Sequence, residues 1–176
     1  APVRSAQSSG AALAAPLALA RVAAGHGYRR YWLAEHHNMP AVAATNPPVL
    51  VAMVAAATTR IRVGSGGVML PNHAPLVVAE QFALLEAAFP GRIDLGIGRA
   101  PGTDPVTSWA LRHGAGGVEA DAVDRFPDHV DHVIAMMSRL YWVRLFGGWR
   151  EYFQPWARAW RGGRCRLRGG RVGGWV

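Results

Sequence analysis

Apolar and polar residues follow one another along this chain in two rhythms, one helical and one typical of buried strands. The clearest helical segment begins at Pro75, where Val78, Phe82 and Leu85 recur on one face and polar residues fall largely off it. Short runs that are apolar throughout predict strands covered on both faces. These criteria predict helices over residues 11–24, 47–57, 75–89, 105–111 and 120–137, and strands over residues 31–34, 61–63, 68–70 and 93–97.

Two prolines bear on where helices begin. Pro16 lies inside the first helical segment, and an interior proline removes a backbone hydrogen bond, so we expect the regular helix to begin there. Pro127 interrupts the last segment, which predicts either a kink or a later start for that helix.

Strands that alternate with helices predict an α/β fold with a parallel sheet and crossover helices. Two architectures satisfy this pattern, an open doubly wound sheet and a (β/α)8 TIM-type barrel. The glycine motifs typical of dinucleotide and nucleoside triphosphate sites are absent from the sequence. In both architectures the carboxyl ends of the strands form one face, where polar groups from distant loops meet.

The first predicted loop at this face carries a carboxylate and two imidazoles, Glu35, His36 and His37. Because neighbours at a strand end point to opposite sides, one histidine is expected to face the site and the other to pack. Glu35 would then hold a neighbouring backbone group or an arginine. A metal site with His73 as a further ligand is the alternative, but no ligand spacing supports it, and we predict no metal.

The other two loops are rich in glycine. Gly66 and Gly67 remove side chains where a strand reaches the face, which permits a flat ring to lie against the backbone or, equally, a bulge. Gly98 precedes Arg99, whose guanidinium suits a phosphate group or an ion pair with Asp104.

The net charge of +8 is confined to the end of the chain. Residues 139–176 contain nine of the 19 basic residues and one Glu, so the first 138 residues are neutral overall. We therefore divide the chain into a domain, residues 1–137, and an Arg/Gly/Trp-rich tail, residues 138–176. We interpret this tail as non-native to the fold or disordered, for example through a shifted reading frame. A nucleic-acid-binding tail with stacking Trp residues is the alternative that we do not favour.

Composition also bears on the compartment. A single cysteine, Cys165, excludes an internal disulfide and a cysteine-based zinc site. The sequence has no uncharged apolar run of roughly 18 residues, the length needed to span a bilayer, and its start lacks the apolar core of a signal peptide. We expect a cytoplasmic protein with no membrane or nucleic-acid partner.

Four segments together resemble the bacterial-luciferase-like family of flavin-dependent monooxygenases, in sequence, order and separation. They are YWLAEHHNM at 31–39, RIRVGSGGVMLPNHAP at 60–75, EQFALLE at 80–86 and PGRIDLGIGRAPG at 90–102. The resemblance covers residues 10–137 and implies a partial (β/α)8 barrel. A complete barrel has about 250 residues, so we expect an amino-terminal part, too short to be a complete enzyme.

The resemblance implies a site for FMN, used in reduced form together with O2 to oxygenate an organic substrate. A separate flavin reductase and a homodimer are the partners it suggests. Two other functions stay open: an F420-dependent reductase of the same superfamily, and a non-catalytic, flavin-free remnant or subunit that pairs with a partner barrel.

The resemblance also assigns roles to single residues. His36 is similar to the active-site histidine of the Glu-His-His motif, which transfers a proton or donates a hydrogen bond to the flavin. Gly66 and Gly67 resemble a non-proline cis peptide beneath the flavin ring, and Arg99 resembles a residue that contacts the flavin phosphate. Gly98 stands where luciferase has a reactive cysteine, which argues against light-emitting chemistry.

Overall fold

The computed structural model describes residues 8–100, 103–114 and 124–146. The chain divides into two compact units, Ala1–Ser138 and Arg139–Val176, and the first unit carries the fold described below. The predicted tail falls mainly on residues 147–176, outside the described residues. Its separation from a domain of residues 1–137 therefore stays a prediction.

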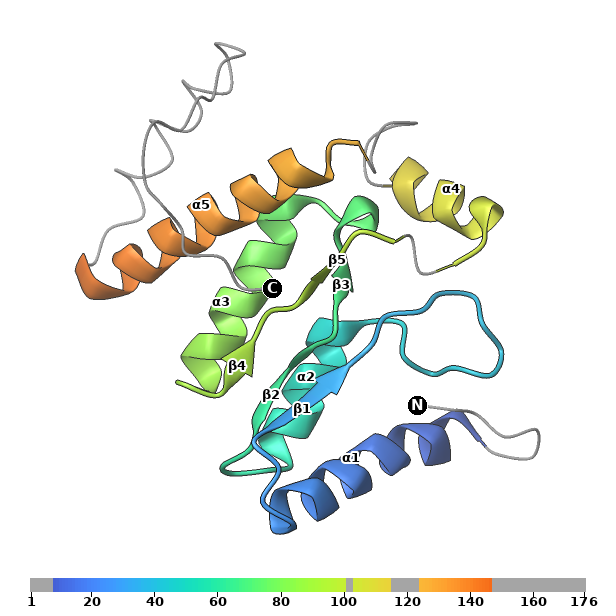
Figure 1. Cartoon of the computed structure of the whole chain (residues 1–176), viewed down its shortest axis with the longest axis vertical. Helices are drawn as coiled ribbons and strands as arrows, with labels where there is room; N and C mark the ends of the chain where they lie inside the picture. The colour runs from blue at the N-terminus through green and yellow to red at the C-terminus, as the bar shows by residue number, and fades with distance from the viewer. Residues whose placement is uncertain (1–7, 101–102, 115–123, 147–176) are drawn as a thin grey trace. The chain divides into compact units, whose positions relative to one another are not determined.

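Helices and parallel strands alternate along the first unit, which confirms the predicted α/β class (Figure 1). The helices are α1 (Ser9–Gly25), α2 (Pro47–Ala56), α3 (Pro75–Ala88), α4 (Pro105–Gly114) and α5 (Phe126–Phe146), with a short 3-10 helix, η1 (Leu70–Asn72). The strands are β1 (Arg30–Leu33), β2 (Arg62–Ser65), β3 (Val68–Met69), β4 (Ile93–Asp94) and β5 (Ile97–Gly98).

The strands form two small parallel sheets. One has the order β1-β2-β4, with Trp32 opposite Gly64 and Gly64 opposite Asp94, and the other pairs β3 with β5. Among the described strands neither sheet closes on itself, so β1 and β4 are edges. This arrangement places the carboxyl ends of β1, β3 and β5 where the loops of interest begin (Figure 1).

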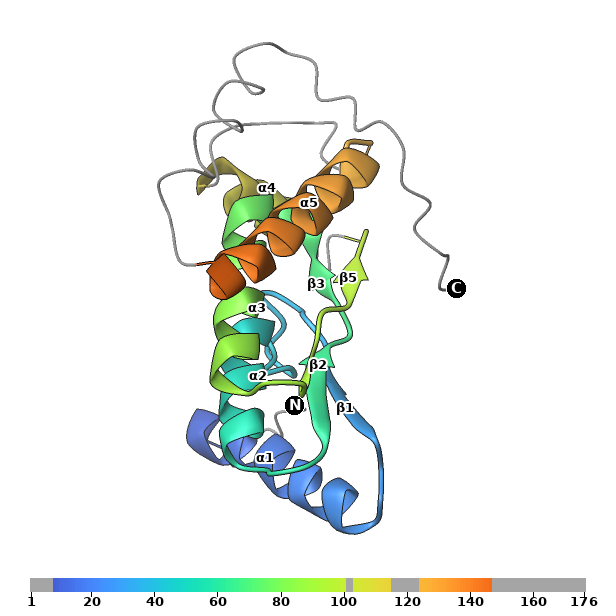
Figure 2. The same cartoon turned by 90° about the vertical axis from the view of Figure 1, so that its left-hand side faces the viewer.

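Helices α1, α2 and α3 lie on one face of the larger sheet, and the core fills the space between them (Figure 2). Leu33, Val63 and Phe82 are buried there, together with Val133 of α5. The Arg92 guanidinium supports this layer, because it donates to backbone carbonyls at the end of α2 and before β2 and to the hydroxyl of Thr58. The opposite face of the sheet carries alternate residues of the same strands.

The first helix begins earlier than predicted. The side chain of Ser8 caps α1 by accepting from the amide of Ala11 at 3.2 Å, and Pro16 lies inside the helix. Ala12, Pro16 and Ala20 are buried at a spacing of four residues. One continuous buried stripe therefore holds the helix together across the proline, at the expense of one backbone hydrogen bond.

The last helix agrees with the second alternative for Pro127, a later start. It begins at Phe126 and places the proline in the first turn, where a missing amide hydrogen costs little. It extends to Phe146, beyond the predicted end at residue 137, so the helix continues into the first residues of the segment that we interpreted as a non-native or disordered tail. None of the helices in the described ranges has the length and apolar character required to cross a bilayer.

The prediction of one strand over residues 93–97 is wrong in one respect. This segment forms two strands, β4 and β5, which belong to different sheets. Between them the Ser65 hydroxyl donates to the carbonyl of Gly96 at 2.9 Å and accepts from its amide at 3.1 Å. A Cβ at Gly96 would lie 2.3 Å from the carbonyl oxygen of Ser65. The break thus depends on a close backbone approach that only glycine allows.

Candidate functional site

The loops that follow β1, β3 and β5 meet at one edge of the fold, as the sequence predicted. The amide of Met69 donates to Oε2 of Glu35 at 2.9 Å, and the hydroxyl of Thr103 donates to the carbonyl of His37 at 2.8 Å. The amide of Gly66 donates to the carbonyl of Leu33 at 2.8 Å. We call this edge the rim and define it as residues 34–46, 66–74 and 98–100 with Thr103.

A buried carboxylate organises the rim. The side chain of Glu35 is 0% exposed, and its Oε1 lies 2.6 Å from Nε2 of His37 and 2.7 Å from Nε2 of His73. Burial alone would raise the pKa of Glu35, but hydrogen bonds from His73, His37 and the Met69 amide outweigh burial and lower it. The carboxylate is therefore ionised and can only accept, so both Nε2 atoms carry a hydrogen.

The same residues form the set of ligand atoms that could surround a metal ion. Single ligand atoms of Glu35, His37 and His73 all lie within 4.8 Å of one another. Hydrogen bonds between these atoms account for the arrangement without an ion, because each imidazole Nε2 is paired with the carboxylate. The expectation that no metal binds stays a prediction. Sequence reasoning considered His73 only as a metal ligand and missed its hydrogen bond to Glu35.

The two adjacent histidines have different surroundings, and which of them faces a ligand stays a prediction. His37 packs, because its ring is bound to Glu35 and its carbonyl accepts from Thr103. His36 is fixed through its backbone, whose amide donates to the carbonyl of Ala44 at 2.8 Å. Its Nδ1 is buried and has no hydrogen-bond partner among the described residues. A buried polar atom in this state is a candidate for binding a ligand, although the catalytic role of His36 stays a prediction.

The peptide bond between Gly66 and Gly67 is cis, as the resemblance implied. Gly66 is exposed, and Gly67 is packed so closely that a Cβ there would lie 2.9 Å from the carbonyl oxygen of Gly96. The rim therefore includes exposed backbone at Gly66, which the side chain of Trp32 borders. This confirms the geometry expected at these glycines, while their contact with a cofactor stays a prediction.

Gly98 and Arg99 lie at the end of β5. Gly98 is paired with Met69, and a Cβ there would lie 2.7 Å from the sulfur of that side chain. Arg99 is exposed and makes no hydrogen bond or ion pair with the described part of the chain. The ion pair between Arg99 and Asp104, which the sequence left open, is not formed among the described residues. Instead, a hydrogen bond from the Thr107 hydroxyl and further bonds in that turn lower the pKa of Asp104 to about 2.

A second polar group, on the sheet face opposite the helices, was missed by sequence reasoning. Asp94 accepts from Nε of Arg62 at 2.9 Å, from Nε of Arg30 at 3.1 Å and from Nε1 of Trp32 at 3.2 Å. Burial would raise the pKa of Asp94, but hydrogen bonds from Arg62 and Trp32 and the arginine charges lower it overall. The sequence did contain a signal for this group, because charged residues occupy alternate positions within runs that otherwise have the pattern of buried strands.

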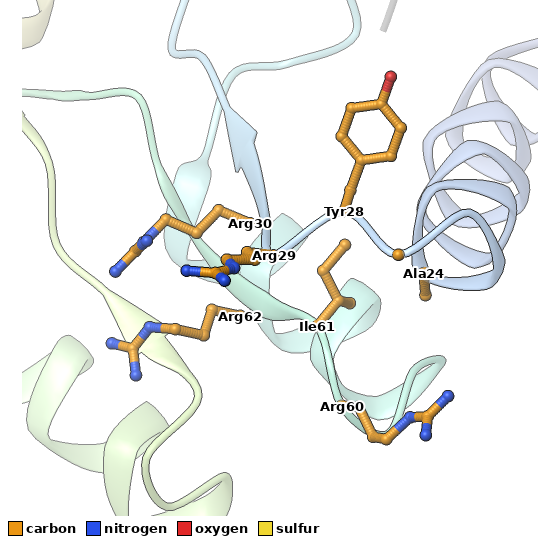
Figure 3. A pocket seen from close by; sticks show the side chains of 8 residues that line it. Ala24, Tyr28, Arg29, Arg30, Arg60, Ile61 and Arg62 are labelled. Carbon is orange, nitrogen blue, oxygen red and sulfur yellow. The ribbon is translucent and has the colours of Figure 1, made fainter.

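A hollow of about 440 Å³ lies at the other end of the strands, away from the rim (Figure 3). It is lined by Ala24, Gly27, Tyr28, Arg29, Arg30, Arg60, Ile61 and Arg62. Figure 3 shows the guanidinium groups of Arg29, Arg30 and Arg62 on one side and that of Arg60 on another. Arg30 and Arg62 already have a carboxylate partner, because both are paired with Asp94.

Comparison with known proteins agrees with this geometry. Residues 1–143 match the sequence profile of a family described as luciferase-like monooxygenase. The luciferase-like monooxygenase of Escherichia coli K12 is 51% identical over 134 residues, which are 76% of this chain and 39% of that protein. The solved structure of apo-MsnO8 is 40% identical with a TM-score of 0.70, over 78% of this chain and 40% of that one.

A more distant structure shows likeness of fold alone. The oxygenating constituent of 3,6-diketocamphane monooxygenase from Pseudomonas putida, solved in complex with FMN, is 24% identical with a TM-score of 0.63. The match covers 79% of this chain and 36% of that one.

The first unit is thus a luciferase-like barrel that is partial and not closed, and the chain spans about two fifths of the length of the relatives described above. The family profile matches 143 of the 176 residues. The sequence identity to the Escherichia coli protein and the fold shared with apo-MsnO8 support the same assignment. On this evidence the chain belongs to the luciferase-like monooxygenase family.

Proposed function

We propose that this chain carries the amino-terminal part of an FMN site in a monooxygenase that uses reduced flavin and O2 to oxygenate an organic substrate. Its partners would be that substrate, a flavin reductase and a second copy of the chain. One observation carries the proposal: the accessible cis peptide at Gly66-Gly67 lies in the same rim as the unpaired Nδ1 of His36 and the exposed Arg99.

The rim residues match three chemical features of FMN: its flat ring, its phosphate and the position beside the ring where a proton is held. A flat aromatic ring needs exposed backbone to lie against, and Gly66 is exposed. The close approach of Trp32 to Gly66 and of Gly96 to Gly67 explains why these two positions carry no side chain. A phosphate needs a cation whose hydrogen-bond donors are not already used, and Arg99 meets this condition within the described residues. Bound reduced flavin would supply the electrons that activate O2. His36 would hold or move a proton at Nδ1 beside the ring.

Anaerobic titration with reduced FMN tests the proposal, with oxygen uptake measured after air is admitted. We expect saturable binding by the unsubstituted chain. Arg99→Gln should raise Kd about 10- to 100-fold, because a charge-assisted contact contributes on the order of 1.5–3 kcal/mol. The matched control is Arg60→Gln, since Arg60 is also exposed but lies at the opposite end of the strands. An equal effect of both substitutions would contradict the assignment of Arg99.

The same titration with F420 separates the other functions. Reduction of F420 without oxygen uptake would replace the proposal with an F420-dependent reductase. A folded chain that binds neither cofactor and elutes as a dimer from a size-exclusion column would instead support a flavin-free subunit.

A further inference from the structure

Trp32 lies beside the cis peptide with much of its indole uncovered. Its exposed fraction is 57%, although it belongs to β1 and stands in register with Gly64 of the central strand. A Cβ at Gly66 would lie 3.1 Å from Cβ of Trp32 and 3.6 Å from Cε3 of its ring. The indole therefore lies beside the backbone of Gly66. Their common surface is on the sheet face opposite the helices.

The indole is held in place although it is exposed. Its Nε1 donates to Oδ2 of Asp94 at 3.2 Å, and Asp94 is itself fixed by Arg62 and Arg30. Gly64 allows this arrangement, because a Cβ there would lie 2.6 Å from Cβ of Asp94. An indole that is fixed in this way beside Gly66 can form part of a binding surface for a ring held there.

We propose that Trp32 is a stacking platform that contacts the flat ring of a flavin bound at Gly66-Gly67. The inference rests on the proposed FMN site and adds a residue to it. Aromatic rings stack in offset contact, and an indole fixed beside an accessible peptide forms a second wall of the space that a ring would enter. Trp32 is then a positioning residue for the cofactor, while His36 acts on protons.

This contact has a spectroscopic signature that a merely structural tryptophan lacks. An indole in contact with a photoexcited flavin donates one electron to it and then takes that electron back, so emission is lost without net reaction. Tyrosine donates less readily than tryptophan, and phenylalanine does not donate. The emission of bound flavin should therefore increase in the order Trp, Tyr, Phe at position 32.

The test is a titration of oxidised FMN into the full chain, with bound and free flavin separated by ultrafiltration and the lifetime of the bound flavin measured. We expect short-lived emission for the unsubstituted chain, an intermediate lifetime for Trp32→Tyr and a several-fold longer lifetime for Trp32→Phe. Trp109→Phe is the matched control, because Trp109 is 56% exposed but belongs to α4. Far-UV circular dichroism of each variant shows whether the helices are retained.

The outcomes separate this inference from the function on which it rests. Bound flavin that is equally quenched in all position-32 variants, or a longer lifetime in Trp109→Phe, overturns the role of Trp32 and leaves the FMN site intact. If the unsubstituted chain binds neither oxidised nor reduced FMN, both the role of Trp32 and the proposed FMN site are overturned. If Trp32→Phe does not fold, the lifetime of Trp32→Tyr against the unsubstituted chain decides the question.

Discussion

Replacing Glu35 by Gln tests whether one buried carboxylate holds the rim together. The substitution keeps the shape of the side chain but removes the charge from hydrogen bonds with His37, His73 and the Met69 amide. Weakening the two imidazole bonds costs about 1 kcal/mol each, and leaving the Met69 amide against a donor NH2 costs about 1–3 kcal/mol. Relief of the buried charge offsets part of this. We expect Glu35→Gln to lower the free energy of unfolding by about 2–4 kcal/mol.

The same network predicts how stability depends on pH. Glu35 has a pKa below its ordinary value of 4.5 in the folded chain, so the ionised form is favoured by folding. The stabilisation is fully present above pH 4.5 and is lost as the pH falls through the lower folded value. The difference in free energy of unfolding between the unsubstituted chain and Glu35→Gln should therefore be largest near neutral pH and should become smaller in acid.

Urea unfolding followed by far-UV circular dichroism measures both effects without the Trp signal of the tail. Glu80→Gln is the control, because Glu80 is exposed and its side chain makes no hydrogen bond or ion pair with the described residues, so its effect should stay within about 0.5 kcal/mol. Equal stability of Glu35→Gln and Glu80→Gln at pH 7 would refute the reasoning. If the difference in free energy of unfolding between the unsubstituted chain and Glu35→Gln becomes larger in acid, the assignment of an ionised Glu35 is refuted.

Two further substitutions test the sheet and a loop of the site. A Cβ at Gly64 would lie 2.3 Å from the carbonyl oxygen of Asp94, so Gly64→Ala should force the paired strands apart and cost about 1–3 kcal/mol in urea unfolding. Gly10→Ala, in an open helical position, should instead stabilise by about 0.5–1 kcal/mol, and a harmless Gly64→Ala would contradict the close approach. Asp104 accepts from the amide and hydroxyl of Thr107 in the first turn of α4. Asp104→Ala should speed hydrogen exchange at that amide, and the unsubstituted chain should show the same loss as the pH falls from 3.8 through about 2. Unchanged exchange in both cases would exclude this cap.

Most of the fold could be predicted because its determinants are local. Apolar stripes and runs identified the five α-helices and, apart from the division of residues 93–97, the strands, and alternation identified the parallel strands. The errors came from contacts between distant segments. A buried stripe holds α1 intact across Pro16, and the hydroxyl of Ser65 divides the expected strand over residues 93–97 at Gly96. The contact between Ser65 and Gly96 leaves no local pattern in the sequence.

The site was predictable in outline for a different reason. Parallel strands bring the loops after their carboxyl ends together whatever those loops contain, so the meeting of Glu35, Met69 and Thr103 at one edge follows from topology. The partner of each side chain does not. Only the structure reveals that Glu35 binds His73 from 38 positions away, or that Asp94 accepts a hydrogen bond from Trp32 on the opposite edge strand, across β2.

The rim is oriented entirely by contacts within the part of the chain that the structure describes. Glu35 joins the first loop to the second, Thr103 joins the third to the first, and Gly66 is tied to the end of β1. These bonds join residues of the chain itself, which spans 39% of the Escherichia coli relative. The geometry around the cis peptide can therefore be tested separately from catalysis. We propose that Trp32, Gly66 and Arg99 let a chain of this length bind flavin whether or not it turns over a substrate, and the anaerobic titration tests this.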